Sequence, residues 1–164
     1  MEAWVTIKTF PGYLISDHGR VRNEDTGRLL ALLRNQRGIV HVGLVRDGQQ
    51  LKRSVAHLVA DAFLPPPPNP AFDCPINLDG DRVNNFAVNL LWRPRWFAVK
   101  YFQQFVNGVR GFDIPIEDLE TGEQFKTSWD AATRYGLIDL HIKVAILNHK
   151  RVWPTNQLYR LLGK

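Results

Sequence analysis

Residues 74–92 of the chain read CPINLDGDRVNNFAVNLLW, and this stretch decides the fold of the middle of the molecule. Two short apolar pieces, around Ile76–Leu78 and Leu90–Trp92, flank a loop that is dense in Asp and Asn. Because such side chains favour turns, the pattern predicts two extended strands joined by a polar loop. The same residue types suit a hard cation or a phosphate, yet the stretch contains no histidine.

A helix is expected directly after the second strand. RPRWFAVKYFQQFVNG at 93–108 places Pro94 where a helix begins and Gly108 where it ends. Strand, loop, strand and helix together predict a ββα unit over residues 73–110. The run PPPPNP at 65–70 comes before this unit and predicts a stiff, extended linker over residues 65–72.

The residues before the linker predict a module of one small sheet and one helix over residues 1–64. Short β-rich runs between residues 4 and 53 alternate with turn signals such as PG at 11–12 and DG at 47–48. This alternation is typical of a meandering antiparallel sheet. RSVAHLVADAF at 53–63 has helical spacing of its apolar residues, so a helix that begins near Ser54 is expected to pack on the sheet.

The last module, residues 111–164, is expected to hold a hairpin and two short helices. The hairpin turns at Glu120-Thr121-Gly122, and Ser128 is expected to cap a helix that Gly136 ends. LHIKVAILNHK at 140–150 predicts the second helix, which makes the pair a helix-turn-helix candidate. The predicted fold class is therefore α+β: a small antiparallel sheet with a helix, a ββα unit, and a C-terminal hairpin with a helix-turn-helix.

Composition and charge narrow the function classes. A chain of 164 residues with 45% hydrophobic and 23% charged residues is typical of a soluble globular protein, and no apolar run is long enough for a bilayer. No secretory signal pattern is present, so a cytoplasmic protein without membrane contact is expected. Cys74 is the single cysteine, which excludes an internal disulfide. The net charge of +5, with five bases and no acid over residues 140–164, favours a polyanionic partner.

All three modules, in this order, resemble the HNH homing endonucleases of phages and introns. Residues 4–64 are similar to the NUMOD4 module, whose frame includes Trp4, Tyr13, Asp17 and Gly19. Residues 76–92 are similar to the HNH core, whose pattern is (Asn/Asp)-His-x-Asp-Gly, Asn-Asn and Asn-Leu-x-Trp. Residues 114–160 look like a NUMOD1-type helix-turn-helix. The resemblance implies a protein encoded by a phage and acting in the host cell.

The resemblance also implies which residues would perform phosphodiester hydrolysis, and the chemistry is missing from those positions. With Asp79-Gly80 as the anchor, the general-base histidine falls on Asn77, the first metal ligand on Ile76 and a later Asn ligand on Ala98. An amide does not accept a proton near neutral pH, and a hydrocarbon offers Mg²⁺ no lone pair. We therefore expect no catalytic residue, metal or cofactor, and structural roles for Asp79, Gly80, Asn85, the retained Asn89 and Trp92.

The expected partner is double-stranded DNA, bound by a catalytically defective regulator or occluding factor. Cations beside the predicted loops and on the predicted second helix would contact it, with Lys143 and His141 directed at base edges. The candidate DNA-binding residues are Arg20, Arg22, Arg34, Arg37, Arg82, Arg93, Arg95, Lys100, His141, Lys143, Lys150 and Arg151.

Two alternatives of other classes stay open. The first is an active Mg²⁺-dependent nicking endonuclease whose ligands have moved to Asp79, Asp81 and Asn89. The second is an accessory protein or inhibitor that binds a phage or host protein through the acidic stretch 113–139.

Overall fold

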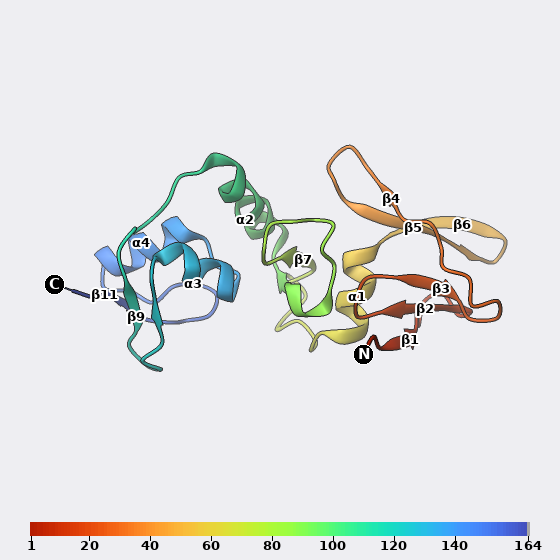
Figure 1. Ribbon diagram of the computed structural model, residues 1–164, viewed down its shortest axis with the longest axis horizontal. Coiled ribbons are helices and arrows are strands. Elements are labelled where there is room, and N and C mark those ends of the chain that lie inside the picture. Colours follow the sequence, from red (N-terminus) through yellow and green to blue (C-terminus); the bar gives the residue numbers. More distant parts are fainter. Residues whose placement is uncertain (164) are drawn as a thin grey trace. The chain divides into compact units, whose positions relative to one another are not determined.

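The structure, a computed structural model, describes residues 1–163, which form two compact units (Figure 1). The first unit is Met1–Ala98 and the second begins at Val99. The class is α+β, as predicted from the sequence. Within the described residues no helix is both long and apolar enough to cross a bilayer.

The first unit holds two antiparallel three-stranded sheets where the sequence predicted one meandering sheet. Their orders are β1-β2-β3 and β4-β5-β6 (Figure 1). Within the region of β-rich runs, the RLLALL stretch at 28–33 is largely loop, with a single bridge from Leu29 to Arg22. The strands are β1 (Trp4–Thr6), β2 (Tyr13–Ser16), β3 (Val21–Asn23), β4 (Leu33–Arg34), β5 (Val40–Arg46) and β6 (Gln49–Ser54).

Helix α1 (Val55–Phe63) closes the core against both sheets. The helix begins where the sequence predicts, because the Ser54 side chain accepts a hydrogen bond from the His57 backbone N–H. Its fully buried Val59 belongs to one core cluster with Ile15 of β2, Leu44 of β5 and Leu90. Burial of these side chains is the main driving force that assembles this unit.

The ββα unit packs on the same helix. Strands β7 (Cys74–Asn77) and β8 (Leu90–Arg93) pair antiparallel, with Asn77 opposite Leu90, and η1 (Ala87–Asn89) is a short 3₁₀ turn before β8. Helix α2 (Arg95–Asn107) follows. Because α1 contacts both β7 and β8, the compact unit continues through the proline-rich segment 65–72 and ends inside α2. The predicted linker therefore does not mark the boundary between the compact units.

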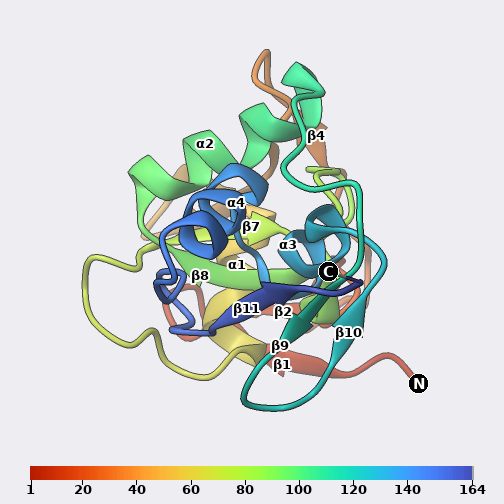
Figure 2. The ribbon, with the colours of Figure 1, turned by 90° about the vertical axis from the view of Figure 1, so that its left-hand side faces the viewer.

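The second unit is a three-stranded sheet, ordered β10-β9-β11, with two helices against it (Figure 2). Its elements are β9 (Ile116–Asp118), β10 (Gln124–Phe125), α3 (Ser128–Tyr135), α4 (Asp139–Leu147) and β11 (Tyr159–Leu161). The hairpin turn and the end of α3 at Gly136, with φ of 66°, lie where the sequence predicts them. The cap of α3 is Thr127 and not Ser128, because Thr127 Oγ1 accepts from the Asp130 N–H.

A buried polar cluster joins the segment after α2 to the start of α4. Asp139, 1% exposed, accepts hydrogen bonds from the Gly111 N–H at 2.8 Å and from the Ser128 hydroxyl. Ser128 Oγ in turn accepts from the Phe112 N–H at 2.7 Å. Gln104 accepts from the Asp139 N–H at 3.0 Å. The cluster explains why α3 starts with a buried Ser128, which the sequence suggested as a cap.

Replacing Tyr159 with Phe is expected to leave stability unchanged or to raise it by about 1 kcal/mol. The Tyr159 side chain is 4% exposed and its hydroxyl has no partner among the described residues, while burial and the neighbouring Asp118 raise its pKa. Thermal unfolding of the variant measures the effect. Tyr135→Phe is the matched control and should lose about 1 kcal/mol, because the Tyr135 hydroxyl donates to Glu123. A larger loss in Tyr159→Phe than in the control would contradict this assignment.

Candidate functional site

The loop between β7 and β8 is built from turns in which Asp side chains bind the following backbone. Asp79 Oδ1 accepts from the Asp81 N–H at 2.9 Å, and Asp81 Oδ1 accepts from the Val83 N–H at 3.0 Å. Gly80 has φ of 78°, a conformation that favours glycine, and its N–H donates to the Asn77 carbonyl. The dense Asp and Asn content of the sequence therefore serves the shape of this loop.

Asp79 and Asn89 hold the two ends of the loop together. Asn89 Nδ2 donates to Asp79 Oδ1 at 2.9 Å, and Asn89 Oδ1 accepts from the Asp79 N–H at 3.2 Å. Asn84 Nδ2 donates to the other Asp79 oxygen at 2.8 Å. Partial burial raises the pKa of Asp79, but the hydrogen bonds from Asn89 and Asn84 outweigh it and leave the pKa below its usual value. Asp79 is thus an ionised carboxylate whose two oxygens both accept hydrogen bonds within the loop.

The three positions that the resemblance assigns to catalysis lie in the interior. Ile76 is 0%, Asn77 3% and Ala98 3% exposed. Asn77 Nδ2 donates at 2.8 Å to the Asn84 carbonyl and at 2.8 Å to Asn85 Oδ1, so the amide is part of the loop framework. A hydrocarbon at 76 and at 98 supplies no ligand, so these residues do not fit the magnesium ion that the HNH pattern implies. Within residues 1–163 no group of three or more His, Cys, Asp or Glu side chains could hold a metal ion.

The turn between β2 and β3 packs directly on this loop. The Ala87 N–H donates to the Asp17 carbonyl at 2.8 Å, and His18 stacks on Phe86 with ring centroids 4.4 Å apart. Gly19 has φ of 82°, and a Cβ there would lie 3.1 Å from the Asn85 Cβ. This close approach explains the Gly19 of the N-terminal frame.

Of the three histidines in the first unit, His18 and His57 pack their rings on Phe86 and Trp92 of the 74–92 stretch and also have polar neighbours. The ring nitrogens of His18 are each 3.8 Å from a carboxylate, Nδ1 from Glu2 and Nε2 from Asp17. His57 Nε2 lies 2.8 Å from the Asp73 carbonyl oxygen. The ring nitrogens of both histidines thus already have polar neighbours within the first unit.

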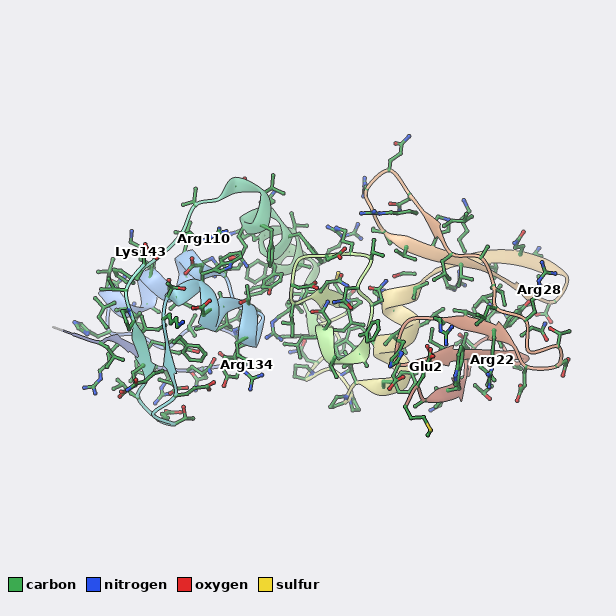
Figure 3. All side chains as sticks on the ribbon, viewed as in Figure 1. Glu2, Arg22, Arg28, Arg110, Arg134 and Lys143 are labelled. Carbon is green, nitrogen blue, oxygen red and sulfur yellow. The ribbon has the colours of Figure 1, made fainter. Side chains whose placement is uncertain are left out.

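The predicted DNA-binding cations of the N-terminal sheets are partly committed to neighbours. Arg20 forms a bidentate ion pair with Glu2, and the guanidinium of Arg22 lies 4.3 Å from the centroid of the Trp4 ring. Glu2 and Arg22 are labelled in Figure 3. Arg34 Nε donates to the Gly38 carbonyl at 3.3 Å. Arg37 is exposed in the loop between β4 and β5.

Arg93 corrects one prediction. It is 8% exposed, donates at 2.7 Å to the Trp92 carbonyl and lies over the Phe97 ring, so it is an interior residue and does not present its charge to a phosphate. A half-buried Arg82 has a pKa lowered by burial, while Arg95 and Lys100 are exposed.

In the second unit, three arginines form ion pairs with glutamates of the acidic stretch 113–139. Glu120 pairs with Arg151, Glu117 with Arg160 at 3.0 Å and Glu123 with Arg134 at 4.0 Å. Lys150 is exposed after the end of α4. The acidic stretch 113–139 is therefore not a free acidic patch.

The predicted second helix presents a different outward face from the one expected. Lys143 Nζ lies 5.7 Å from the Phe112 ring centroid, and His141 is half-buried, with a pKa lowered first by burial and then by Lys100. The outermost residues of α4 are the aliphatic Leu140, Val144 and Leu147. Their spacing of four and three residues could have been noticed in the sequence as an apolar stripe.

Replacing Glu2 with Gln is expected to remove a pH-dependent part of the stability. The hydrogen bond from Arg20, with a further one from Ser16, lowers the pKa of Glu2 from 4.5 to about 2. A depressed carboxyl pKa stabilises the fold above the unfolded value, and this contribution disappears as the pH falls through the folded value. The wild-type advantage over Glu2→Gln should therefore be complete above pH 4.5 and vanish near pH 2.

Acid titration of both proteins by circular dichroism checks this expectation. Glu24→Gln is the control, because Glu24 is an exposed carboxylate in the turn directly after β3. An equal pH dependence in Glu2→Gln and wild type would contradict the role of the Glu2–Arg20 pair.

Comparison with known proteins shows what this chain is similar to. The NUMOD4 motif model matches residues 2–45. An uncharacterized HNH endonuclease of Acanthamoeba polyphaga mimivirus, L245, is 32% identical over 89 residues, which are 54% of this chain and 26% of that protein. The chain thus spans about a quarter of the length of this curated relative. Among solved structures, the chain is similar to that of the HNH homing endonuclease I-HmuI, which concerns DNA binding and cleavage by that enzyme. The TM-score is 0.56 at 21% sequence identity, and the match covers 99% of this chain and 99% of that one.

Proposed function

We propose that this chain, which has the N-terminal motif and the fold of an HNH homing endonuclease, binds double-stranded DNA without cleaving it. One observation carries the proposal. The loop frame of the ββα unit is complete, with Asp79, Asn84 and Asn89 mutually hydrogen-bonded, while positions 76, 77 and 98 hold buried side chains without a base or a ligand. A protein of this kind would act as a regulator or occluding factor on phage or host DNA.

The nicking alternative has less support from the geometry. Its relocated ligands would be Asp79, Asp81 and Asn89, and oxygens of all three accept hydrogen bonds from the loop itself. A cation would have to replace these internal partners, which keep the loop in its shape. The protein-binding alternative also has less support, because three arginines of the second unit already pair with glutamates of the acidic stretch that would contact the partner.

DNA binding is supported by exposed cations in both units and by a net charge of +5. Arg37, Arg95 and Lys150 are exposed, and a duplex contacted by three such side chains would lose three condensed counterions. The affinity should therefore fall steeply as salt concentration rises. Each lost phosphate contact reduces the slope of log affinity against log salt by about 0.9.

Fluorescence anisotropy with duplex fragments of the parent genome tests the proposal. The wild type should bind at low salt, and the variant Arg37→Ala/Arg95→Ala/Lys150→Ala should have a salt slope smaller by about 3. Arg160→Ala is the control for a cation that Glu117 already neutralises, and its slope should stay near wild type. Absence of duplex binding by the wild type at low salt would end the proposal.

A further inference from the structure

The outward face of α4 is apolar along its length. Leu140 is 40%, Val144 55% and Leu147 60% exposed, and their spacing places them on one side of the helix. The opposite side, with Ile142 at 0% and Ala145 at 9% exposed, packs into the core of the second unit. We call Leu140, Val144 and Leu147 the aliphatic stripe.

Charge around the stripe indicates a polyanionic partner. Lys143, labelled in Figure 3, belongs to α4 and directly precedes Val144 of the stripe in the sequence, and Lys150 follows the end of the helix. The single acid of the helix, Asp139, is 1% exposed and faces inward to Gly111 and Ser128. The helix therefore presents aliphatic groups flanked by cations, with no outward carboxylate to repel a phosphate.

A duplex offers one apolar group that this stripe could bind in the major groove. That group is the C5-methyl of thymine, which the major-groove edge of a G·C pair lacks, so an aliphatic side chain there would face hydrogen-bonding atoms without an apolar contact to offset them. We propose that α4 reads thymine methyl groups through Leu140, Val144 and Leu147, and so selects thymine-rich duplexes. This inference rests on the proposed DNA-binding function and adds the chemical class of its target.

The expected discrimination follows from the hydrophobic effect. Burial of one methyl group is worth roughly a fourfold change in affinity, so several contacted methyls give roughly tenfold or more. The cations beside the stripe contribute affinity that does not depend on base sequence. Replacement of thymine by uracil should thus weaken binding without abolishing it at low salt.

The test compares thymine with deoxyuridine in otherwise identical duplexes. The best-bound duplex from a random-sequence library is synthesised with thymine and again with deoxyuridine, which removes the methyl groups and leaves phosphates and hydrogen-bonding edges unchanged. The wild type should bind the thymine duplex roughly tenfold more tightly or better. The variant Leu140→Ala/Val144→Ala/Leu147→Ala should bind both duplexes with similar affinity.

A matched variant and a fold check make the result decisive. Val106→Ala changes an 86% exposed valine of the same unit and should keep the thymine preference. Unchanged thermal unfolding of the triple variant shows that its effect is on recognition. Equal wild-type affinity for the two duplexes would overturn the inference and leave the proposed function standing, whereas no binding to any duplex would overturn both.

Discussion

Changing Ile76, Asn77 and Ala98 to Asn, His and Asn together is expected to create the nicking activity that, under the proposed function, the wild type lacks. The loop frame around these positions is already formed by Asp79, Asn84, Asn85 and Asn89. The triple variant adds the residue types that the HNH pattern has there. A positioned general base alone is worth about 100-fold or more, so conversion of supercoiled plasmid to nicked circle with Mg²⁺ should rise by at least that factor.

The matched control separates the base from the ligands. Ile76→Asn/Asn77→Ala/Ala98→Asn has the same two amides and no imidazole, and it should stay near the wild-type level. Position 76 is fully buried, so Ile76→Asn will lower stability, and both variants must show wild-type secondary structure by circular dichroism. Nicking by the wild type at the rate of the restored variant would contradict the assignment of the defect to these residues.

Asp139→Ala is expected to destabilise the second unit by about 3 kcal/mol. The substitution leaves the Gly111 N–H without its buried acceptor and the Ser128 hydroxyl with only the Phe112 carbonyl at 3.2 Å, and it removes the contact that ties the segment after α2 to α4. Denaturant unfolding of the full chain, followed through near-ultraviolet circular dichroism, measures the loss.

Asp113→Ala is the control for this prediction. Asp113 is an exposed carboxylate close to the same segment, and its removal should cost less than about 0.5 kcal/mol. A loss below about 1 kcal/mol for Asp139→Ala would mean that the buried cluster does not organise the unit.

Local signals in the sequence predicted much of the fold. Ser54 before α1, the turn at 120–122 and Gly136 after α3 act within a few residues, so each could be recognised from the sequence alone. The pair β7 and β8 followed by α2 is confirmed for the same reason. The resemblance to HNH homing endonucleases, drawn from residue patterns, is also confirmed.

Features that depend on distant partners were missed. Strand β11 forms because Tyr159 pairs with Asp118, a register that no local pattern in its short sequence indicates. The separation into two N-terminal sheets has the same origin, since α1 packs against both. Arg93 was expected at the surface because arginine is usually exposed, yet the Trp92 carbonyl and the Phe97 ring make its burial possible.

The candidate site was predictable in its residue types and not in its geometry. The absence of a base at 77 and of ligands at 76 and 98 could be read from the sequence. That Asn77 instead donates to Asn84 and Asn85 required the structure, as did the apolar outward face of α4. The predictions that the site holds no metal and that the exposed cations bind DNA stay predictions.

Incubation of the wild-type protein with supercoiled plasmid and Mg²⁺, at a protein concentration where all the plasmid is shifted in a native gel, is the most direct measurement. The proposed function predicts that the plasmid is fully bound and remains supercoiled after deproteinisation. Nicking that co-purifies with the protein and disappears in Asp79→Ala would contradict it.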